Sequence, residues 1–277
     1  MKKQLFIPFI IALGLTSTTT LASIGEAAQS QKPSDNTLPA VFQAAGTTAG
    51  SIQSTVDAFR AALGEPNNGN NPGQLASGRR EINWDGGNPN VVATTAPVTP
   101  FDVFLNTRGA QFTTPGLGLS QATPLGITGL FNNPNYETDF STFSPSRLFT
   151  PVGSNVTEAV FFVPGTSGAL AAMVTGFGAV FTDVDQPDGS GPSKKKGNRG
   201  ASTLVEYFGA DGKVLFSSFI PASPGDGSLS FFGIVFDEPL IARVRITTGD
   251  TAPGPDDDEK QDIVMMDDFL YGEPQAR

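Results

Sequence analysis

Short apolar segments recur at close intervals through the second half of the chain, and each is bounded by glycine, proline or aspartate. The clearest alternation runs from Ala242 to Thr247, where two arginines and a threonine separate the apolar side chains. A period of two places alternate side chains on opposite faces of a strand, so one face should be buried and the other exposed. Seven such segments predict a mainly β fold, an antiparallel β-sandwich. They span residues 156–163, 174–182, 202–208, 213–220, 229–236, 241–247 and 262–271.

The first half of the chain contains one helical stripe, with an apolar residue on the same face at each turn. Gly64 follows the stripe and is placed to end the helix. We therefore expect one short N-terminal helix at 51–63, inside a leader at 29–78 that is otherwise flexible and rich in polar and turn residues. The sandwich domain is expected to span 79–275. The stripe consists of Ile52, Val56, Phe59 and Leu63.

The N-terminus has the three parts of an export signal. Lys2 and Lys3 precede an apolar run at 5–15, and small residues follow it. This pattern predicts a signal peptide at 1–28 and a secreted or periplasmic protein. No later segment is apolar over the length that a membrane helix needs, so we expect no stable membrane insertion.

Composition narrows the chemistry. The chain contains no histidine and no cysteine, which excludes a Ser-His-Asp triad, thiol catalysis, disulfides and zinc sites built on these residues. The net charge of −10 argues against nucleic acid as a partner and makes a divalent cation a natural one. Most of the 22 phenylalanines should lie in a core, because phenylalanine has no polar group to present to solvent.

A calcium site is the most specific candidate in the sequence. Asp183, Asp185 and Asp188 leave a predicted strand and enter a glycine-containing loop, and Asp267 and Asp268 lie in the last strand. Calcium prefers several oxygen ligands, which these carboxylates can supply. We therefore predict that Asp183 and Asp185 bind calcium together with Asp267 or Asp268.

Two simpler interpretations of these aspartates stay open. Aspartate commonly ends strands and shapes turns without any metal. Adjacent strand residues face opposite ways, so one carboxylate of the Asp267–Asp268 pair should point inward and need a partner. Arg243 and Arg245 are candidate partners that require no metal.

Trp84 and Asp85 form a candidate ligand-binding pair. Trp84 is the one tryptophan of the chain and lies between two polar residues. Such an indole, flanked by Asn83 and Asp85, could be a platform that stacks on a sugar ring. The alternative is that Trp84 is a half-buried strand residue near a sheet edge.

Six blocks that cover most of the predicted domain resemble a family of exported bacterial proteins of uncharacterised function. The last block ends in the sequence DDFLYGE, which is also similar to the final strand of secreted jelly-roll modules of the galactose-binding-like and MAM types. The second resemblance implies a jelly-roll sandwich, a structural calcium ion and, in some members, glycan binding. The blocks are residues 80–86, 147–166, 176–185, 204–215, 227–250 and 262–275.

These observations favour a secreted, non-enzymatic binding module that is stabilised by calcium and binds an extracellular glycan or a cell-surface component. One alternative is an extracellular structural protein without a small-molecule site. Another is a carbohydrate-active enzyme with paired carboxylates, for which Glu81 with Asp85 or Asp237 with Glu238 are the nearest pairs.

Overall fold

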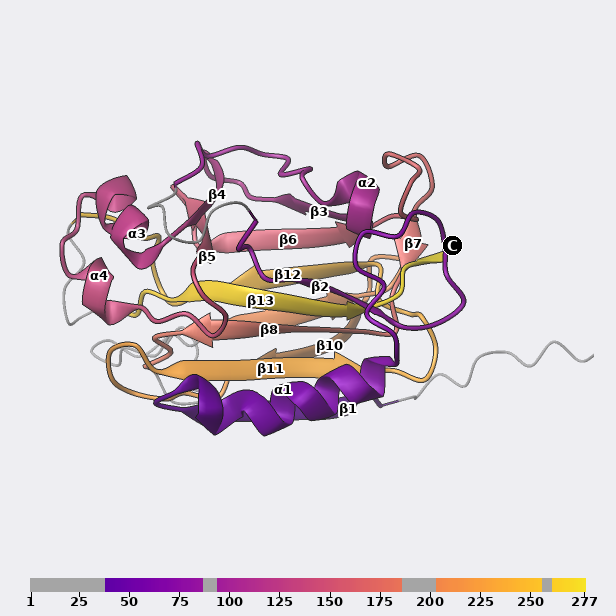
Figure 1. Cartoon of the computed structure of the whole chain (residues 1–277), viewed down its shortest axis with the longest axis horizontal. Helices are drawn as coiled ribbons and strands as arrows, with labels where there is room; N and C mark the ends of the chain where they lie inside the picture. Colours follow the sequence, from indigo (N-terminus) through magenta and orange to yellow (C-terminus); the bar gives the residue numbers. More distant parts are fainter. Residues whose placement is uncertain (1–37, 87–93, 186–202, 256–260) are drawn as a thin grey trace, which may run out of the picture. The chain divides into compact units, whose positions relative to one another are not determined.

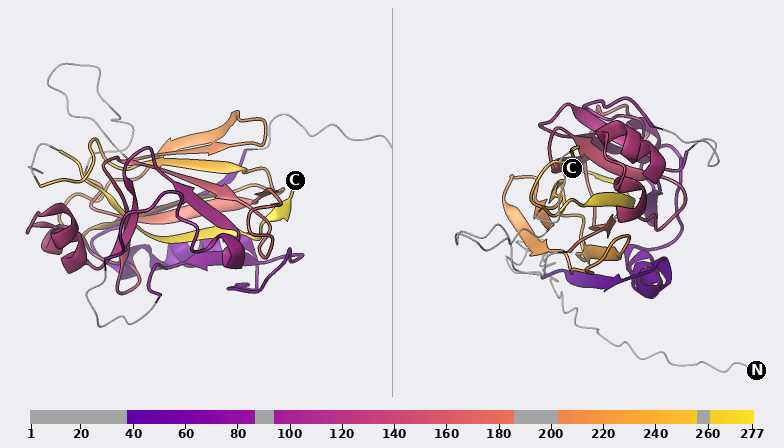
Figure 2. Two further views of the ribbon diagram at one scale, coloured as in Figure 1. Left: turned by 90° about the horizontal axis from the view of Figure 1, so that it is seen from above. Right: turned by 90° about the vertical axis from the view of Figure 1, so that its left-hand side faces the viewer.

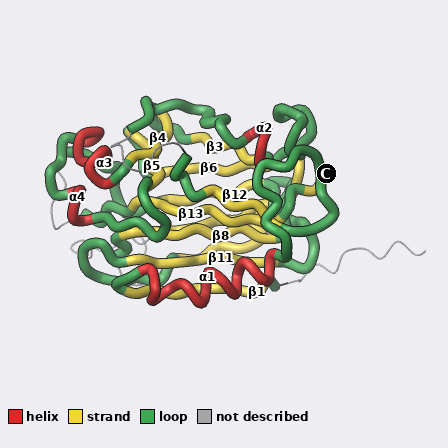
Figure 3. The backbone as a smooth tube through the Cα atoms, in the orientation of Figure 1, coloured by secondary structure: helices red, strands yellow, loops and turns green. Residues whose placement is uncertain are grey.

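Two antiparallel sheets form the framework of the computed structural model, which describes residues 38–86, 94–185, 203–255 and 261–277 (Figure 1). The tube in Figure 3 shows how strands and loops outweigh the helices. The facing surfaces of the two sheets enclose one aromatic core. In this core, Phe112 and Phe161 of the five-stranded sheet meet Phe269 and Phe177 of the seven-stranded sheet. Within the described residues, no helix combines the length and apolar character that crossing a membrane requires.

The seven-stranded sheet is buried on both faces along its central strands. Every residue of β8 and β13 is buried, as is all of β11 except its last residue. The order along the sheet is β1 (Ala40–Gly46), β11 (Leu229–Val235), β8 (Gly176–Thr182), β13 (Met265–Gly272), β5 (Leu148–Val152) and β4 (Gly118–Ala122), and β2 (Arg79–Ile82) also pairs with β13.

The five-stranded sheet alternates between buried and partly exposed positions, most clearly along β6 and β12. Its order is β10 (Val214–Phe219), β9 (Leu204–Phe208), β12 (Arg243–Thr247), β6 (Val156–Phe161) and β3 (Ala110–Thr113). The C-terminal strand β14 (Gln275–Ala276) pairs with β7 (Ala172–Met173) in a small separate sheet.

Helices cover the outer face of the seven-stranded sheet. The apolar stripe of α1 (Ala49–Leu63) packs on Val180, Phe231 and Leu270. Two glycines allow this close approach, because a Cβ at Gly178 or Gly233 would lie 2.8 or 2.7 Å from the ring of Phe59. In the left view of Figure 2, α1 lies below the two sheet layers.

Three shorter helices complete the described structure. α3 (Pro124–Phe131) and α4 (Tyr136–Asp139) pack against Leu148 and Met265 at another part of the same outer face. α2 (Leu105–Arg108) lies directly before β3.

The predicted antiparallel sandwich is confirmed, and each of the seven predicted segments contains a strand. The jelly-roll order of the strands stays a prediction. The predicted helix is confirmed over Ala49–Leu63, with the predicted stripe buried and Gly64 at its C-cap.

The prediction of a flexible leader at 29–78 is wrong for the part of it that the structure describes. Residues 40–46 form β1, which pairs along its whole length with β11, and the compact unit begins at Leu38 rather than at residue 79. Ala40–Gly46 is held by backbone pairing and shows no strong side-chain period, so its sequence gave little sign of a strand. The signal peptide predicted at 1–28 lies outside the described residues.

Candidate functional site

Trp84 is a core residue and not a surface platform, which corrects the ligand-binding role predicted for it. Its side chain is 1% exposed, and its ring stacks on Phe149 with a centroid distance of 3.7 Å. The indole Nε1 donates a hydrogen bond to the backbone oxygen of Asp267 at 3.2 Å. The ring therefore contributes to stability and cannot stack on a ligand in this arrangement.

Asp85 and Asp267 hold the backbone of one segment, residues 143–147. Asp267 Oδ2 accepts hydrogen bonds from the N–H groups of Phe143, at 2.6 Å, and Ser144, at 3.3 Å. Asp85 Oδ1 accepts from the N–H groups of Ser146 and Arg147. This geometry gives both carboxylates a structural role, so the ligand-binding role predicted for Asp85 has no support from its contacts.

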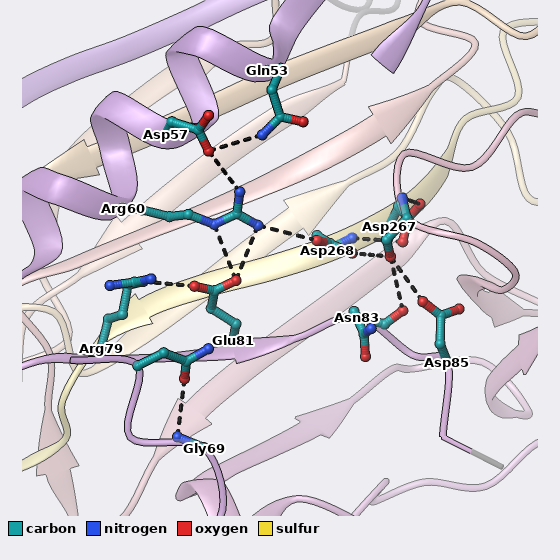
Figure 4. Close-up of polar contacts among 12 residues, drawn as sticks. Gln53, Asp57, Arg60, Gly69, Arg79, Glu81, Asn83, Asp85, Asp267 and Asp268 are labelled. Carbon is teal, nitrogen blue, oxygen red and sulfur yellow. Dashed lines mark hydrogen bonds and ion pairs between the residues drawn. The ribbon is translucent and has the colours of Figure 1, made fainter. Parts of the chain in front are cut away.

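Asp268 takes part in a partly buried charge network (Figure 4). Its Oδ2 lies 3.7 Å from Nη2 of Arg60, and the same nitrogen lies 3.1 Å from Glu81 Oε2. Arg79 Nε binds the other oxygen of Glu81 at 2.7 Å. The guanidinium that pairs with Asp268 therefore comes from helix α1, whereas Arg243 and Arg245, the predicted partners, lie on the other sheet.

Burial shifts the ionisation of the adjacent aspartates. Burial, followed by the neighbouring Asp268 carboxylate, raises the pKa of Asp267 well above its ordinary value. Burial also raises the pKa of Asp268, although the hydrogen bond from Ser144 opposes this shift. The two residues lie in an irregularity of β13, where the register with β8 shifts between Met266 and Phe269. Both carboxylates are buried because β13 is covered on both faces, and every residue of this strand is buried.

Asp183 and Asp185 belong to a different group of acids at the end of β8. Asp183 has a left-handed backbone, with φ of 69°, and its Oδ1 is buried without a hydrogen-bond partner. Asp185 Oδ1 accepts from the N–H of Gly225 at 2.9 Å, and its own N–H donates to Asp262. Burial and the charges of Asp185 and Asp262 raise the pKa of Asp183 to about 9.

The two groups of aspartates do not form the single calcium site that the sequence predicted. Among the described residues, no set of three or more acidic side chains is arranged to hold a metal ion. Asp188, the third acid of the predicted loop, lies outside the described residues. Calcium binding by this chain stays a prediction, without the geometry that would join Asp183 and Asp185 to Asp267 or Asp268.

The outer face of the five-stranded sheet carries a charged network that the sequence only partly indicated. Glu158 Oε1 accepts from Arg243 Nη1 at 2.7 Å and from Arg245 Nε at 2.8 Å, and it lies 2.7 Å from Arg245 Nη2. The guanidinium of Arg243 also lies over the ring of Phe208, 3.7 Å from its centroid. The alternation at 242–247 places the two arginines on one face, but it does not identify the glutamate and the phenylalanine on neighbouring strands.

A shallow hollow of about 280 Å³ lies beside this network. Glu158 and Arg245 line it together with Thr113, Thr114, Pro115 and Val156. Its volume is slightly below the roughly 300–1,000 Å³ typical of small-molecule pockets, so it can hold a group of about the size of one sugar unit. Hydroxyl, carboxylate and guanidinium groups all line this hollow.

Comparisons with protein-family models, with curated proteins and with solved structures found no match to this chain.

Proposed function

We propose that this protein is a secreted, non-enzymatic binding module that holds a glycan on the outer face of its five-stranded sheet. One observation carries the proposal: helices cover the outer face of one sheet, whereas the other presents an ordered polar network with a hollow beside it. The export part of the proposal rests on the N-terminal pattern of Lys2, Lys3 and the apolar run at 5–15.

The polar groups on this face suit hydroxyl-rich ligands. Arg245 is 43% exposed, and its Nε and Nη2 face Glu158, so the rest of its planar donor set can reach a ligand. Two guanidiniums share the Glu158 carboxylate, which fixes all three side chains before a ligand arrives. Such preorganisation lowers the entropy cost of binding.

The balance of charge on this face favours a neutral glycan over a polyanion. Arg243 and Arg245 are matched by Glu158 and by Glu206, which is the cross-strand neighbour of Arg245 on β9. A nucleic acid would need a basic surface, and the chain as a whole carries a charge of −10.

Glu158 and Glu206 also keep the hydrolase alternative testable. Both pair with Arg245, one from each neighbouring strand, so their backbones are roughly 10 Å apart at about 4.8 Å per strand. Inverting glycosidases separate their two carboxyl groups by roughly 6.5–9.5 Å on opposite sides of the sugar. Here both residues project from one sheet face with Arg245 between them, which favours binding over cleavage.

The test is binding of the full chain to a panel of neutral polysaccharides, with affinities measured by calorimetry. We expect Arg245→Ala to weaken binding at least 10-fold, a loss of at least about 1.4 kcal/mol. Ser54→Ala, on the exposed side of α1, is the matched control and should bind as wild type. The release of reducing sugar ends is assayed in the same mixtures of protein and polysaccharide, because hydrolysis would produce them.

Two results would overturn the proposal. Equal binding by wild type and Arg245→Ala would move the site away from this face. Release of reducing ends that stops in Glu206→Gln would replace the binding module with a hydrolase.

A further inference from the structure

The strand register lines up five hydrogen-bonding side chains in one row across the whole five-stranded sheet. Each member pairs directly with the next along the row, so the row is continuous from β3 to β10. At each of the five positions the side chain is partly or fully exposed. The row consists of Thr113, Glu158, Arg245, Glu206 and Ser217.

We infer that this row is a track for an extended polysaccharide that lies across the strands, an inference that rests on the proposed glycan-binding function. Neighbouring strands are about 4.8 Å apart, so five strands give a row of about 19 Å. An extended β-linked pyranose chain advances per sugar by a similar distance. One hydrogen-bonding side chain therefore meets each successive sugar.

The rows on either side of the track contain apolar side chains. On one side, Val156, Leu204 and Phe219 face outward with Thr247 between them. On the other, Val160 and Phe208 flank Arg243. A pyranose ring has polar edges and less polar faces, so a polar track between partly apolar rows matches both parts of the sugar.

The two ends of the track differ. At β3 it begins in the hollow lined by Thr113, Glu158 and Arg245. At β10 it ends on the exposed Ser217, in a strand whose one described partner is β9. A track that continues onto an open sheet edge can accept an internal part of a long chain, so we assign internal segments rather than chain ends as the ligand.

The inference is tested with β-1,4-linked glucose and N-acetylglucosamine oligosaccharides from disaccharide to hexasaccharide, titrated into the full chain. We expect the affinity to rise at least 10-fold from disaccharide to pentasaccharide and then to level off. Ser217→Ala should weaken pentasaccharide binding several-fold and leave disaccharide binding in the hollow unchanged. Thr113→Ala, at the other end, should weaken binding of both.

The outcomes separate this inference from the function on which it rests. One outcome is that Arg245→Ala weakens binding, while oligosaccharides of every length bind with the same affinity and Ser217→Ala has no effect. The hollow alone would then bind sugar, and the inferred track would be wrong. If loss of affinity follows Leu204→Ala and Phe219→Ala instead of the row, the chain lies elsewhere on this face and the inference also fails. Binding that no substitution on this sheet changes would remove the proposed function itself.

Discussion

The two sheets of this molecule are built from the same kind of strand but differ in what lies on their outer faces. β8 reads GFGAVFT and is buried at every position, because the aromatic core lies on one side and α1 on the other. β12 reads RVRIT and alternates, because only its valine and isoleucine face the core. A continuous apolar run is typical of a strand that is covered on both faces, and alternation of a strand that meets water on one.

The comparison also explains how the same kind of charged group is used differently in the two sheets. Beside the seven-stranded sheet, the Arg80–Glu273 ion pair is almost fully buried, with side chains 0% and 2% exposed. On the five-stranded sheet, Glu158 and its two arginines are between 24% and 43% exposed. The first arrangement joins distant parts of the chain, whereas the second keeps polar groups available to a ligand.

The largest expected effect comes from Glu273→Gln. Glu273 binds Arg80 through two contacts of 2.6 and 2.7 Å, and loss of its charge leaves a buried guanidinium without a counter-ion. Breaking a buried ion pair on one side typically costs about 3–5 kcal/mol. The free energy of unfolding in urea measures the loss. A loss as small as that expected for an exposed pair would mean that burial does not distinguish the two regions.

Asp267→Ala should have the next largest effect. The substitution removes the acceptor for the backbone N–H groups of Phe143, Ser144 and Asp268. The Asp268 N–H is buried and costs about 1–3 kcal/mol without an acceptor, whereas the N–H groups of Phe143 and Ser144 are only partly buried and cost less. Asp267→Asn is the matched control, because its one remaining oxygen can still accept from the N–H groups of Phe143 and Ser144, whereas its amide nitrogen cannot accept from Asp268. Equal unfolding free energies for the two variants would show that the backbone hydrogen bonds contribute little.

Sequence patterns predicted the strands of the second half because those strands carry their own apolar periodicity. β4, with the sequence GLSQA, and β1 were missed because they are held by pairing with β5 and β11. The two aspartates of β13 show a second limit. Alternation predicts one buried carboxylate, whereas β13 is covered on both faces and both carboxylates are buried.

In the candidate site as well, the sequence pattern does not identify which residues of adjacent strands lie side by side. The alternation at 242–247 placed Arg243 and Arg245 on one face, and that face is the one now proposed to bind a ligand. It could not show that Glu158 and Glu206 flank Arg245, because strand order and register depend on the whole fold. For the same reason, Arg60 of α1 could not be recognised as the partner of Asp268.

Asp183→Asn is expected to stabilise the protein at neutral and alkaline pH. The pKa of Asp183 is about 9 in the fold, against an ordinary value of 3.8, so the folded state binds a proton that the unfolded chain has already released. Its contribution to stability is therefore complete below about pH 4 and is lost as the pH rises towards 9. Asparagine needs no proton and can donate to the neighbouring carboxylates.

We expect a gain of about 1–3 kcal/mol for this variant, the usual cost of a buried polar atom without a partner. Urea unfolding between pH 4 and 9 measures how the gain grows with pH. Ser54→Ala, on the exposed side of α1, is the control and should keep the wild-type free energy of unfolding across this pH range. A gain that does not change with pH would show that Asp183 releases its proton at the same pH in both states.

The smallest effect on stability is expected for Glu158→Gln, the counterpart of Glu273→Gln on the open sheet. Exposed ion pairs contribute about 0–1 kcal/mol, because solvent already stabilises both charges. Removing Glu158 leaves Arg243 and Arg245 as like charges on one strand face, so the loss should be greatest at low salt and fade as salt screens their repulsion. Unfolding free energies at low and high salt measure this change, and Glu273→Gln in the same series should depend little on salt because its partner is buried. If Glu158→Gln were as costly as Glu273→Gln, the network would be a structural element of the sheet, and the preorganised polar surface would lose its main support.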